Sequence, residues 1–286
     1  MAKQTIYITS AADLSIKNSQ LQITFPDQGT SLLRSIEDLG TLIIDHHSAH
    51  LTVPLLNRLA EQNVAVVFCN ETHTPTTMLM DLDSNYMQSK HMRAQLEAGK
   101  PLCKQIWKQI VEYKIRNQSA LLEKLGFGDD PLHRYHTQVK SGDNTNREGV
   151  AAKIYWQMLF GRQFIRDRMG TPPNNLLNYG YAILRSSVAR AIMDAGLLPM
   201  VGVFHRNYYD AFPLADDLME PFRPFIDEKV LSLHQQGVAD IDFAVKKEII
   251  ETFYQELSQD QISAAAHSLV RLFEKEGNVM CYPILN

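Results

Sequence analysis

Hydrophobic residues in the first quarter of the chain follow the spacing of β-strands. The candidate strands are residues 4–9, 14–25, 41–44 and 64–68. The first is rich in β-branched residues, the second ends in the alternating Leu21, Ile23 and Phe25, and the last two are continuous apolar runs. Between them, leucines at helical spacing predict a helix over residues 51–62, with Ser48 as a candidate N-cap. The pattern predicts a small sheet-based domain crossed by one helix.

After Pro75 the pattern changes to amphipathic helices. The clearest helix is expected over residues 174–195, with Asn174 as a cap and Gly196 as a stop. Further helices are expected over 246–257 and 262–276, the latter closed by Gly277, whereas the polar segment 126–147 is expected to be an exposed loop. We therefore predict an α+β protein of two domains. They are an N-terminal β-sheet or sandwich domain (1–76), a connector (77–90) and a larger all-α catalytic domain (91–286).

Length and composition describe an ordinary globular protein. The chain has 286 residues, of which 45% are hydrophobic and 21% charged. Its first ten residues contain no apolar core of signal-peptide length, and the longest near-apolar stretch, 195–204, is about half of the roughly 20 residues that cross a bilayer. The three cysteines are isolated, which favours reduced thiols. We expect a soluble, cytoplasmic protein with no membrane association.

The net charge of −4 does not by itself suggest a DNA-binding protein. Basic residues are unevenly placed, however. One group is Lys104, Lys108, Lys114 and Arg116, and another is Arg162, Arg166 and Arg168. Charge alone favours solvated faces of surface helices, with a local basic face as the alternative.

Three residues in the second half of the chain are potential metal ligands: Glu148, His205 and Glu220. Taken singly, each has an ordinary explanation, as a first-turn glutamate, a satisfied polar residue after an apolar run and a solvated acidic turn. Taken together, two carboxylates and an imidazole can hold a divalent cation and leave positions open for a phosphodiester.

The sequence around these three residues carries a family resemblance. Glu148 begins E-G-V-A-A-K-I-Y-W, His205 follows G-L-L-P-M-V-G-V-F, and Glu220 lies in D-L-M-E-P-F-R-P. Two further segments are K-I-R-N-Q (114–118) and L-N-Y-G-Y (177–181). In this wording and order the chain resembles the CRISPR-associated integrase and endonuclease family, the Cas1 proteins. Glutamate at 220, where many relatives have aspartate, resembles the branch that accompanies type II systems.

The resemblance implies a metal-dependent DNA integrase of CRISPR adaptation. By this resemblance a 3′-hydroxyl of new spacer DNA attacks a phosphodiester of the repeat, in a transesterification with Mg²⁺ or Mn²⁺ as cofactor. Glu148, His205 and Glu220 are then the metal ligands and catalytic residues. Asp217 is expected to orient His205 or a metal-bound water, and the candidates for DNA contact are Arg223, Arg162, Arg166 and Lys114. The implied partners are double-stranded DNA, a second copy of the chain, Cas2 in a larger complex, and other type II adaptation proteins.

Two alternative functions follow from other features. A non-catalytic scaffold that binds DNA ends would need no metal ligands. An Asp-His-His metal phosphoesterase would use the I-I-D-H-H segment, with Asp45 and His46 as ligands. That class needs a D-x-D motif upstream, and here Asp81 and Asp83 follow Asp45 instead, so a polar connection between strand and helix is favoured.

Overall fold

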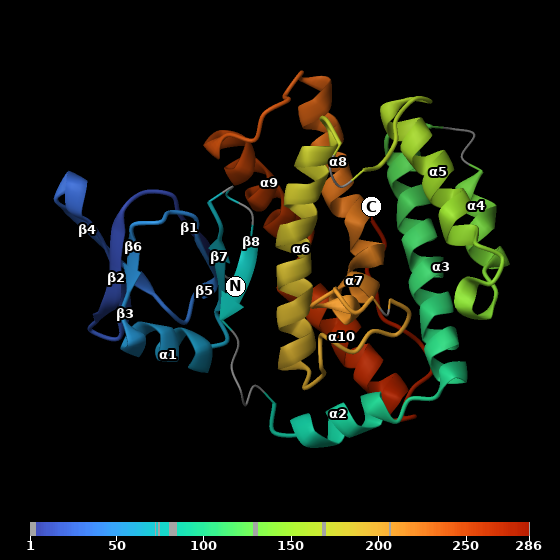
Figure 1. Ribbon diagram of the computed structural model, residues 1–286, viewed down its shortest axis with the longest axis horizontal. Helices are drawn as coiled ribbons and strands as arrows, with labels where there is room; N and C mark the ends of the chain where they lie inside the picture. The colour runs from blue at the N-terminus through green and yellow to red at the C-terminus, as the bar shows by residue number, and fades with distance from the viewer. Residues whose placement is uncertain are drawn as a thin grey trace. The chain divides into compact units, whose positions relative to one another are not determined.

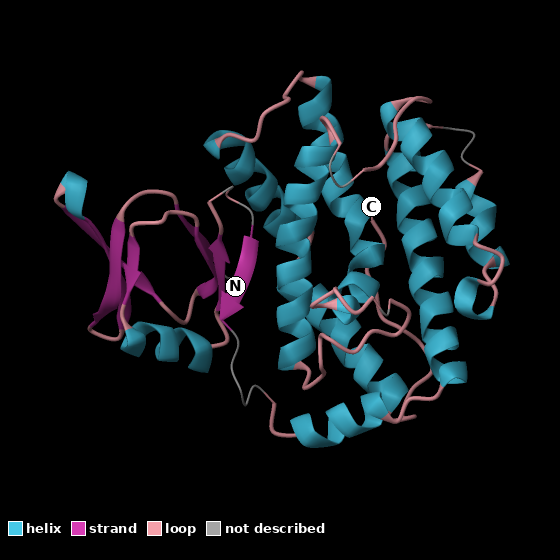
Figure 2. Ribbon diagram, in the orientation of Figure 1, coloured by secondary structure: helices cyan, strands magenta, loops and turns pink. Residues whose placement is uncertain are grey.

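The chain folds into two compact units, Met1–Ser84 and Asn85–Asn286. The computed structural model describes residues 4–71, 73, 75–79, 85–127, 131–167, 170–205 and 207–285. Strands form the first unit, and helices form the second (Figures 1 and 2). The predicted fold class, α+β with a small β-sheet domain followed by a larger helical domain, is confirmed.

Two four-stranded sheets build the first unit. One has the order β1 (Gln4–Ile8), β5 (Leu39–Ile44), β7 (Ala65–Cys69), β8 (Pro75–Leu79), with only the last strand antiparallel to its neighbour. The other has the order β4 (Thr30–Ser35), β3 (Gln20–Phe25), β2 (Ala12–Lys17), β6 (Ala49–Leu51), with β2 and β6 parallel. Helix α1 (Val53–Glu61) connects β6 to β7.

The two sheets and α1 share one hydrophobic core. Leu42 of β5, Leu14 of β2 and Leu55 of α1 are each at most 1% exposed and belong to the same cluster of buried residues. Truncation of such a leucine to alanine costs about 2–5 kcal/mol. The alternating apolar positions therefore hold the two sheets face to face around a single interior.

Several details of the first unit differ from the sequence prediction. Segment 14–25 is not one strand but a hairpin, because Asn18 and Ser19 have φ of 51° and 61° and form a two-residue turn between β2 and β3. The short strands β4 and β6 were not predicted. Helix α1 begins after Thr52, so Ser48 is not its N-cap; the Ser48 amide instead donates to Nδ1 of His46.

The strand-rich unit extends a few residues beyond its predicted end at residue 76, and the division between the units falls inside the predicted connector. Strand β8 continues to Leu79 because it pairs with the edge of β7, Leu79 lying opposite Val66. Helix α2 (Gln88–Leu96) begins inside the predicted connector 77–90, and the two units divide at Ser84 and Asn85. Strand β8 has no buried residue and no alternating pattern, which is why periodicity did not reveal it.

Helices α3 (Lys100–Lys124) and α6 (Asn174–Asp194) are the longest of the second unit. The others are α4 (Leu132–Tyr135), α5 (Arg147–Phe160), α7 (Pro213–Met219), α8 (Arg223–Gln235), α9 (Phe243–Glu256) and α10 (Gln259–Phe273). Helix α5 packs beside α3, while α7 to α10 pack on α6 (Figure 1). Within residues 85–285, the described positions contain no strand.

Two contacts fix the packing of α8. Gly180 allows α6 to approach α8 closely, since a Cβ there would lie 2.4 Å from Cγ2 of Ile226. The buried carboxylate of Asp227 accepts hydrogen bonds from the hydroxyls of Tyr155 on α5 (2.7 Å) and Tyr181 on α6 (2.5 Å). Burial raises the pKa of Asp227 to about 6, against the two tyrosine hydrogen bonds that lower it.

The helix ends of the second unit also show differences. Asn174 is the first residue of α6 and Pro173 its N-cap, whereas Gly196 does end the helix with φ of +76°. Helix α10 ends at Phe273, because Lys275 takes the left-handed conformation, so Gly277 is not its stop. The predicted loop 126–147 contains α4 and 3₁₀ turns. None of the described helices is both long and apolar enough to span a bilayer.

Candidate active site

Glu148 lies in the first turn of α5, which two polar side chains cap. The carboxylate of Asp143 accepts hydrogen bonds from the backbone amides of Arg147 (2.8 Å) and Glu148 (2.9 Å). The N-cap residue Asn146 accepts one from the amide of Gly149. These bonds satisfy amide groups that have no partner inside the helix. They fix the backbone of Glu148, whose side chain stays 24% exposed.

Glu220 begins the 3₁₀ turn between α7 and α8 and is only 3% exposed. Its Oε1 pairs with Nη2 of Arg223 at 2.8 Å. Asn117 of α3 holds the same turn by donating to the carbonyl of Pro221 at 2.7 Å. Burial acts to raise the pKa of Glu220, but Arg223 and Lys114 outweigh it and hold that pKa below its ordinary value.

His205 lies in the loop between α6 and α7, and this loop wraps around the carboxylate of Asp217. Asp217 is fully buried and accepts hydrogen bonds from the amides of Val203 (2.6 Å) and Phe204 (2.8 Å). Nδ1 of His205 donates to the other oxygen of Asp217 at 2.6 Å, which fixes the ring and leaves Nε2 free of that bond. This hydrogen bond raises the pKa of His205, against partial burial, which lowers it.

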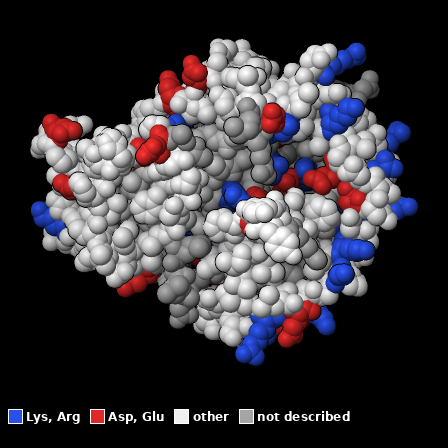
Figure 3. Space-filling model, viewed as in Figure 1, with Lys and Arg blue, Asp and Glu red and all other residues white. Residues whose placement is uncertain are grey.

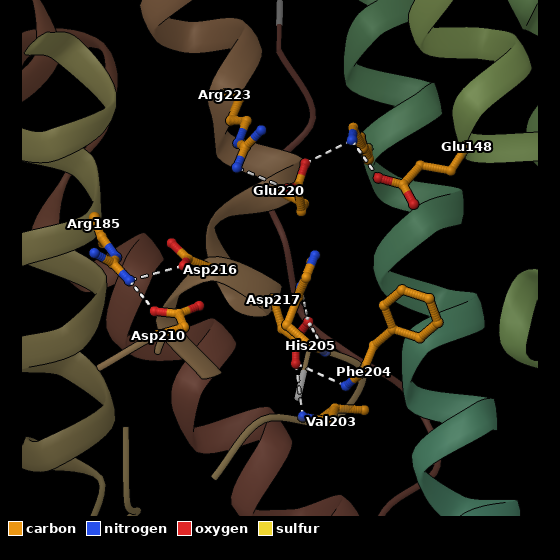
Figure 4. Close-up of polar contacts among 11 residues, drawn as sticks. Glu148, Arg185, Val203, Phe204, His205, Asp210, Asp216, Asp217, Glu220 and Arg223 are labelled. Carbon is orange, nitrogen blue, oxygen red and sulfur yellow. Dashed lines mark hydrogen bonds and ion pairs between the residues drawn. The ribbon is translucent and has the colours of Figure 1, made fainter. Parts of the chain in front are cut away.

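These three predicted ligands come from separate elements and point toward one another. In Figure 4 the carboxylates of Glu148 and Glu220 and the ring of His205 face a common space. Acidic and basic side chains adjoin in a hollow on the face of the helical unit drawn in Figure 3. Glu148 and Glu220 contribute to the charge that His205 experiences, which places all three within electrostatic range of one another.

The ammonium group of Lys114 lies between the two glutamates. Its Nζ is 2.6 Å from Oε1 of Glu148 and 2.6 Å from Oε2 of Glu220. Lys114 is 7% exposed, so the lysine assigned to possible DNA contact is largely buried. Burial acts to lower its pKa, but the carboxylates of Glu220 and Glu148 outweigh this and raise it.

The oxygen and nitrogen atoms of Glu148, Glu220 and His205 are suitable ligands for a divalent cation, although in this structure the two carboxylates contact the ammonium group of Lys114. In the described part of the chain, no three His, Cys, Asp or Glu side chains are placed as a ready cation site. The set nevertheless contains two carboxylates and an imidazole oriented through Nδ1 by a carboxylate, as is common for histidine ligands. Oε2 of Glu220 is buried, and although it is close to Nζ of Lys114 it takes part in no hydrogen bond of good geometry. These residues therefore fit a cation that would replace the ammonium group.

The arginines proposed for DNA contact have different surroundings. Arg166 donates to the side chains of Asn174 (3.1 Å) and Asn178 (2.7 Å), so it serves the interior of the helical unit. Arg162 is exposed, and Arg223 is half-buried against Glu220. Arg168 lies outside the described residues. Arg162 and Arg223 therefore retain the geometry for a phosphate contact, whereas Arg166 is already occupied.

The alternative ligand pair has a structural role. Asp45 is 5% exposed at the end of β5 and accepts hydrogen bonds from the hydroxyl of Tyr7 and from Nδ1 of His73, the latter at 2.7 Å. The rings of His46 and His47 stack on each other with centroids 4.6 Å apart. Asp81 and Asp83 lie outside the described residues. The described surroundings of Asp45 thus explain it as a connection between strand and helix.

Sequence reasoning did not identify the aromatic residues beside His205. The half-exposed ring of Phe204 stacks on the buried ring of Trp107, with centroids 4.2 Å apart and planes 1° from parallel. The ring of His205 meets both edge-on. A cavity of about 210 Å³ opens beside them, lined also by Lys100 and Lys104. Asp143 was missed as well, and its position five residues before Glu148 was the only signal for it.

Known proteins resemble the chain over nearly its full length. The family described as CRISPR associated protein Cas1 matches residues 6–265. The CRISPR-associated endonuclease Cas1 of Neisseria meningitidis serogroup C (strain 8013) is 36% identical over 262 residues, which cover 90% of this chain and 85% of that protein. A Saccharolobus solfataricus protein, CRISPR-associated endonuclease Cas1 1, is 29% identical over 73% of this chain and 64% of its own length.

Solved structures share the fold at lower sequence identity. A casposase bound to integration product has a TM-score of 0.82 at 20% identity and covers 99% of this chain and 94% of its own. A CAS1 protein from Thermotoga maritima has a TM-score of 0.75 at 19% identity, with 97% and 99% covered. The family match and the Neisseria relative together span the strand-rich unit and the three predicted ligands, and on this basis the chain belongs to the Cas1 family of CRISPR-associated proteins.

Proposed function

We propose that this chain is a metal-dependent DNA integrase and endonuclease of CRISPR adaptation. The observation that supports the proposal is that Glu148, His205 and Glu220, from α5, the loop between α6 and α7 and the turn after α7, face a common space. Membership of the Cas1 family supports it, because the matched relatives are named CRISPR-associated endonucleases.

The reaction would be a transesterification on DNA. The 3′-oxygen of new spacer DNA forms a bond to phosphorus at the repeat boundary, and the bond from that phosphorus to the 3′-oxygen of the repeat strand breaks. Glu148, Glu220 and Nε2 of His205 would hold Mg²⁺ or Mn²⁺. A bound cation of this kind polarises the phosphoryl oxygen and stabilises the attacking and leaving oxygens. The imidazole in the set suits Mn²⁺ at least as well as Mg²⁺, which prefers oxygen ligands.

The remaining residues would position His205 and neutralise the charge of a bound phosphate. Asp217 keeps the proton of His205 on Nδ1 and thereby leaves the Nε2 lone pair available. Arg223, paired with Glu220, can turn its other guanidinium nitrogens to a phosphate oxygen. None of these side chains needs to form a covalent bond to the DNA.

The proposed partners are double-stranded spacer and repeat DNA, a second copy of the chain joined through the strand-rich unit, and Cas2. Other type II adaptation proteins are further candidates. Structures that share this fold include a Cas6-RT-Cas1–Cas2 complex and a casposase bound to integration product, which supports these partner types by analogy. The net charge of −4 indicates that the isolated chain binds DNA modestly and gains affinity on assembly.

Strand joining of a short duplex to repeat DNA tests the proposal. Wild-type protein with Cas2 should join strands only when Mg²⁺ or Mn²⁺ is present, and Glu148→Ala should remove the activity. Asp45→Asn, which removes the charge of the alternative ligand and keeps its size, is the matched control and should join strands normally. Activity that survives in Glu148→Ala, or that needs Asp45, would refute the proposal, and DNA binding without any joining would favour the scaffold alternative.

A further inference from the structure

Lys114 differs from the other lysines described in ion pairs, because it is buried and contacts two carboxylates at once. Lys124, on the same helix, pairs with Glu228 alone at 3.0 Å, and its side chain is 36% exposed. The Lys114 side chain is 9% exposed and its Nζ contacts Glu148 and Glu220 at 2.6 Å each. Its position on α3 places a positive charge at the centre of the candidate site.

The charges around Lys114 balance without any added ion. Glu148 and Glu220 contribute two negative charges, and Lys114 and Arg223 contribute two positive charges, which gives a sum of zero. Removal of Lys114 would leave two carboxylates close together, one of them almost fully buried, with Arg223 as the remaining cation in an ion pair with either of them among the described residues. Unpaired buried charges are strongly destabilising.

Lys114 also contacts the oxygen atoms that a divalent cation would need. Oε1 of Glu148 and Oε2 of Glu220 each lie 2.6 Å from Nζ, so the ammonium group occupies the point between them. An ammonium group and a metal ion cannot both occupy that point, since like charges at such short range repel strongly in a poorly hydrated site. Lysine has a flexible four-carbon chain, which allows its charged end to move away.

We propose that the ammonium group of Lys114 and the divalent cation are alternative occupants of the same carboxylate site. Lys114 is then a positioning residue that keeps Glu148 and Glu220 in place before the metal binds, and it competes with the metal for their oxygens. This inference rests on the proposed function of the site.

The exchange would change the charge of the site. With Lys114 displaced but still charged, the cluster of Glu148, Glu220, Lys114, Arg223 and a divalent cation has a net charge of +2. A DNA phosphodiester then supplies the missing negative charge, and the displaced ammonium group becomes available to it. Metal binding and DNA binding should therefore strengthen each other.

The test compares wild-type protein, Lys114→Met and the control Lys124→Met as full-length chains. Thermal unfolding is measured in chelator and in saturating Mn²⁺, and Mn²⁺ affinity is measured by calorimetry without DNA. Lys114→Met should lower Tm in chelator by about 5–15 °C, because a buried ion pair is broken. It should also tighten Mn²⁺ binding by about 10-fold or more, because the Lys114 ammonium group no longer competes with Mn²⁺ for the two carboxylates. Saturating Mn²⁺ should remove most of the difference in Tm, while Lys124→Met should change neither quantity appreciably.

A second variant keeps the test decisive if Lys114→Met does not fold without metal. The double variant Lys114→Met/Glu148→Gln restores the charge balance, so it should regain most of the lost Tm in chelator and lose the tightened Mn²⁺ binding. The inference is overturned if Lys114→Met binds Mn²⁺ no more tightly than wild type, or if its loss of Tm is equal with and without Mn²⁺. If the inference fails in this way, the proposed function is still supported when wild type binds Mn²⁺ and Glu148→Gln weakens that binding. If wild type and every variant fail to bind Mn²⁺, the inference and the proposed function are both refuted.

Discussion

Replacement of Asp217 by asparagine should separate the stability of the His205 loop from the use of His205 as a ligand. One carboxylate oxygen, Oδ2, accepts from the amides of Val203 and Phe204. The other, Oδ1, accepts from Nδ1 of His205 at 2.6 Å and from the backbone amide of His205 at 3.2 Å. An asparagine at this position would place its carbonyl oxygen toward the two amides, because its NH₂ group cannot accept their hydrogen bonds. The NH₂ group would then face Nδ1 of His205.

This orientation should change the tautomer of the imidazole. An NH₂ group donates, so Nδ1 would have to accept and the ring proton would move to Nε2. Nε2 would then be unavailable to a metal, and strand joining should fall about 10–100-fold, as for the loss of an outer-shell partner of a ligand. Stability should fall by only about 1–2 kcal/mol, since two of the backbone hydrogen bonds are kept.

Asp217→Ala is the matched comparison. This substitution removes both acceptor oxygens and leaves the buried amides of the loop without partners. The loss should lower the free energy of unfolding by about 3–5 kcal/mol and Tm by about 6–20 °C. Thermal unfolding, strand joining and the ¹⁵N chemical shifts of His205 would be measured on both variants. Wild-type joining by Asp217→Asn, or equal losses of Tm in the two variants, would refute this account of the loop.

Three further predictions follow from the charges of the molecule. Glu148→Ala and Glu220→Ala should each abolish strand joining, and the double variant should lose no more than either alone, because a site that lacks one ligand has already failed. Glu220→Ala should in addition lower Tm by about 5–15 °C, since it leaves buried cations unpaired. Equal Tm values for Glu220→Ala and wild type would contradict this. The pKa of Asp227, raised from 3.8 to about 6, means that the folded chain keeps a proton that the unfolded chain has lost. The Asp227 contribution to the unfolding free energy should therefore rise by about 1–2 kcal/mol as pH falls from about 7.5 to 5, and urea titrations of wild type and Asp227→Asn should differ by this amount in their pH dependence. DNA affinity, measured by fluorescence anisotropy, should fall steeply with salt concentration, whereas a salt-independent affinity would argue against phosphate contacts.

Periodicity predicted the elements that bury an apolar face. Residues 41–44 and 64–68 were identified as continuous apolar runs and 174–195 by its helical spacing, because in each the apolar side chains enter a core. Strands β4 and β8 were not predicted from the sequence, because they contain no buried residue and are held by pairing with neighbouring strands. Such pairing depends on contacts between distant parts of the sequence.

The candidate site shows a similar limit. The sequence motifs around Glu148, His205 and Glu220 identified those residues, but the sequence could not show that Lys114 lies between the two glutamates. Lys114 appeared as one cation in a basic group, and only the packing of α3 against the turn at Glu220 distinguishes it from its exposed neighbours.

A crystal of the protein soaked in Mn²⁺ and measured for anomalous scattering would show directly whether Glu148, His205 and Glu220 hold one cation. We expect one anomalous peak in contact with Glu148, Nε2 of His205 and Glu220, with the ammonium group of Lys114 moved away from the point between the two carboxylates. A peak at Asp45 and His46, or Lys114 still bound to both glutamates in a crystal saturated with Mn²⁺, would contradict it.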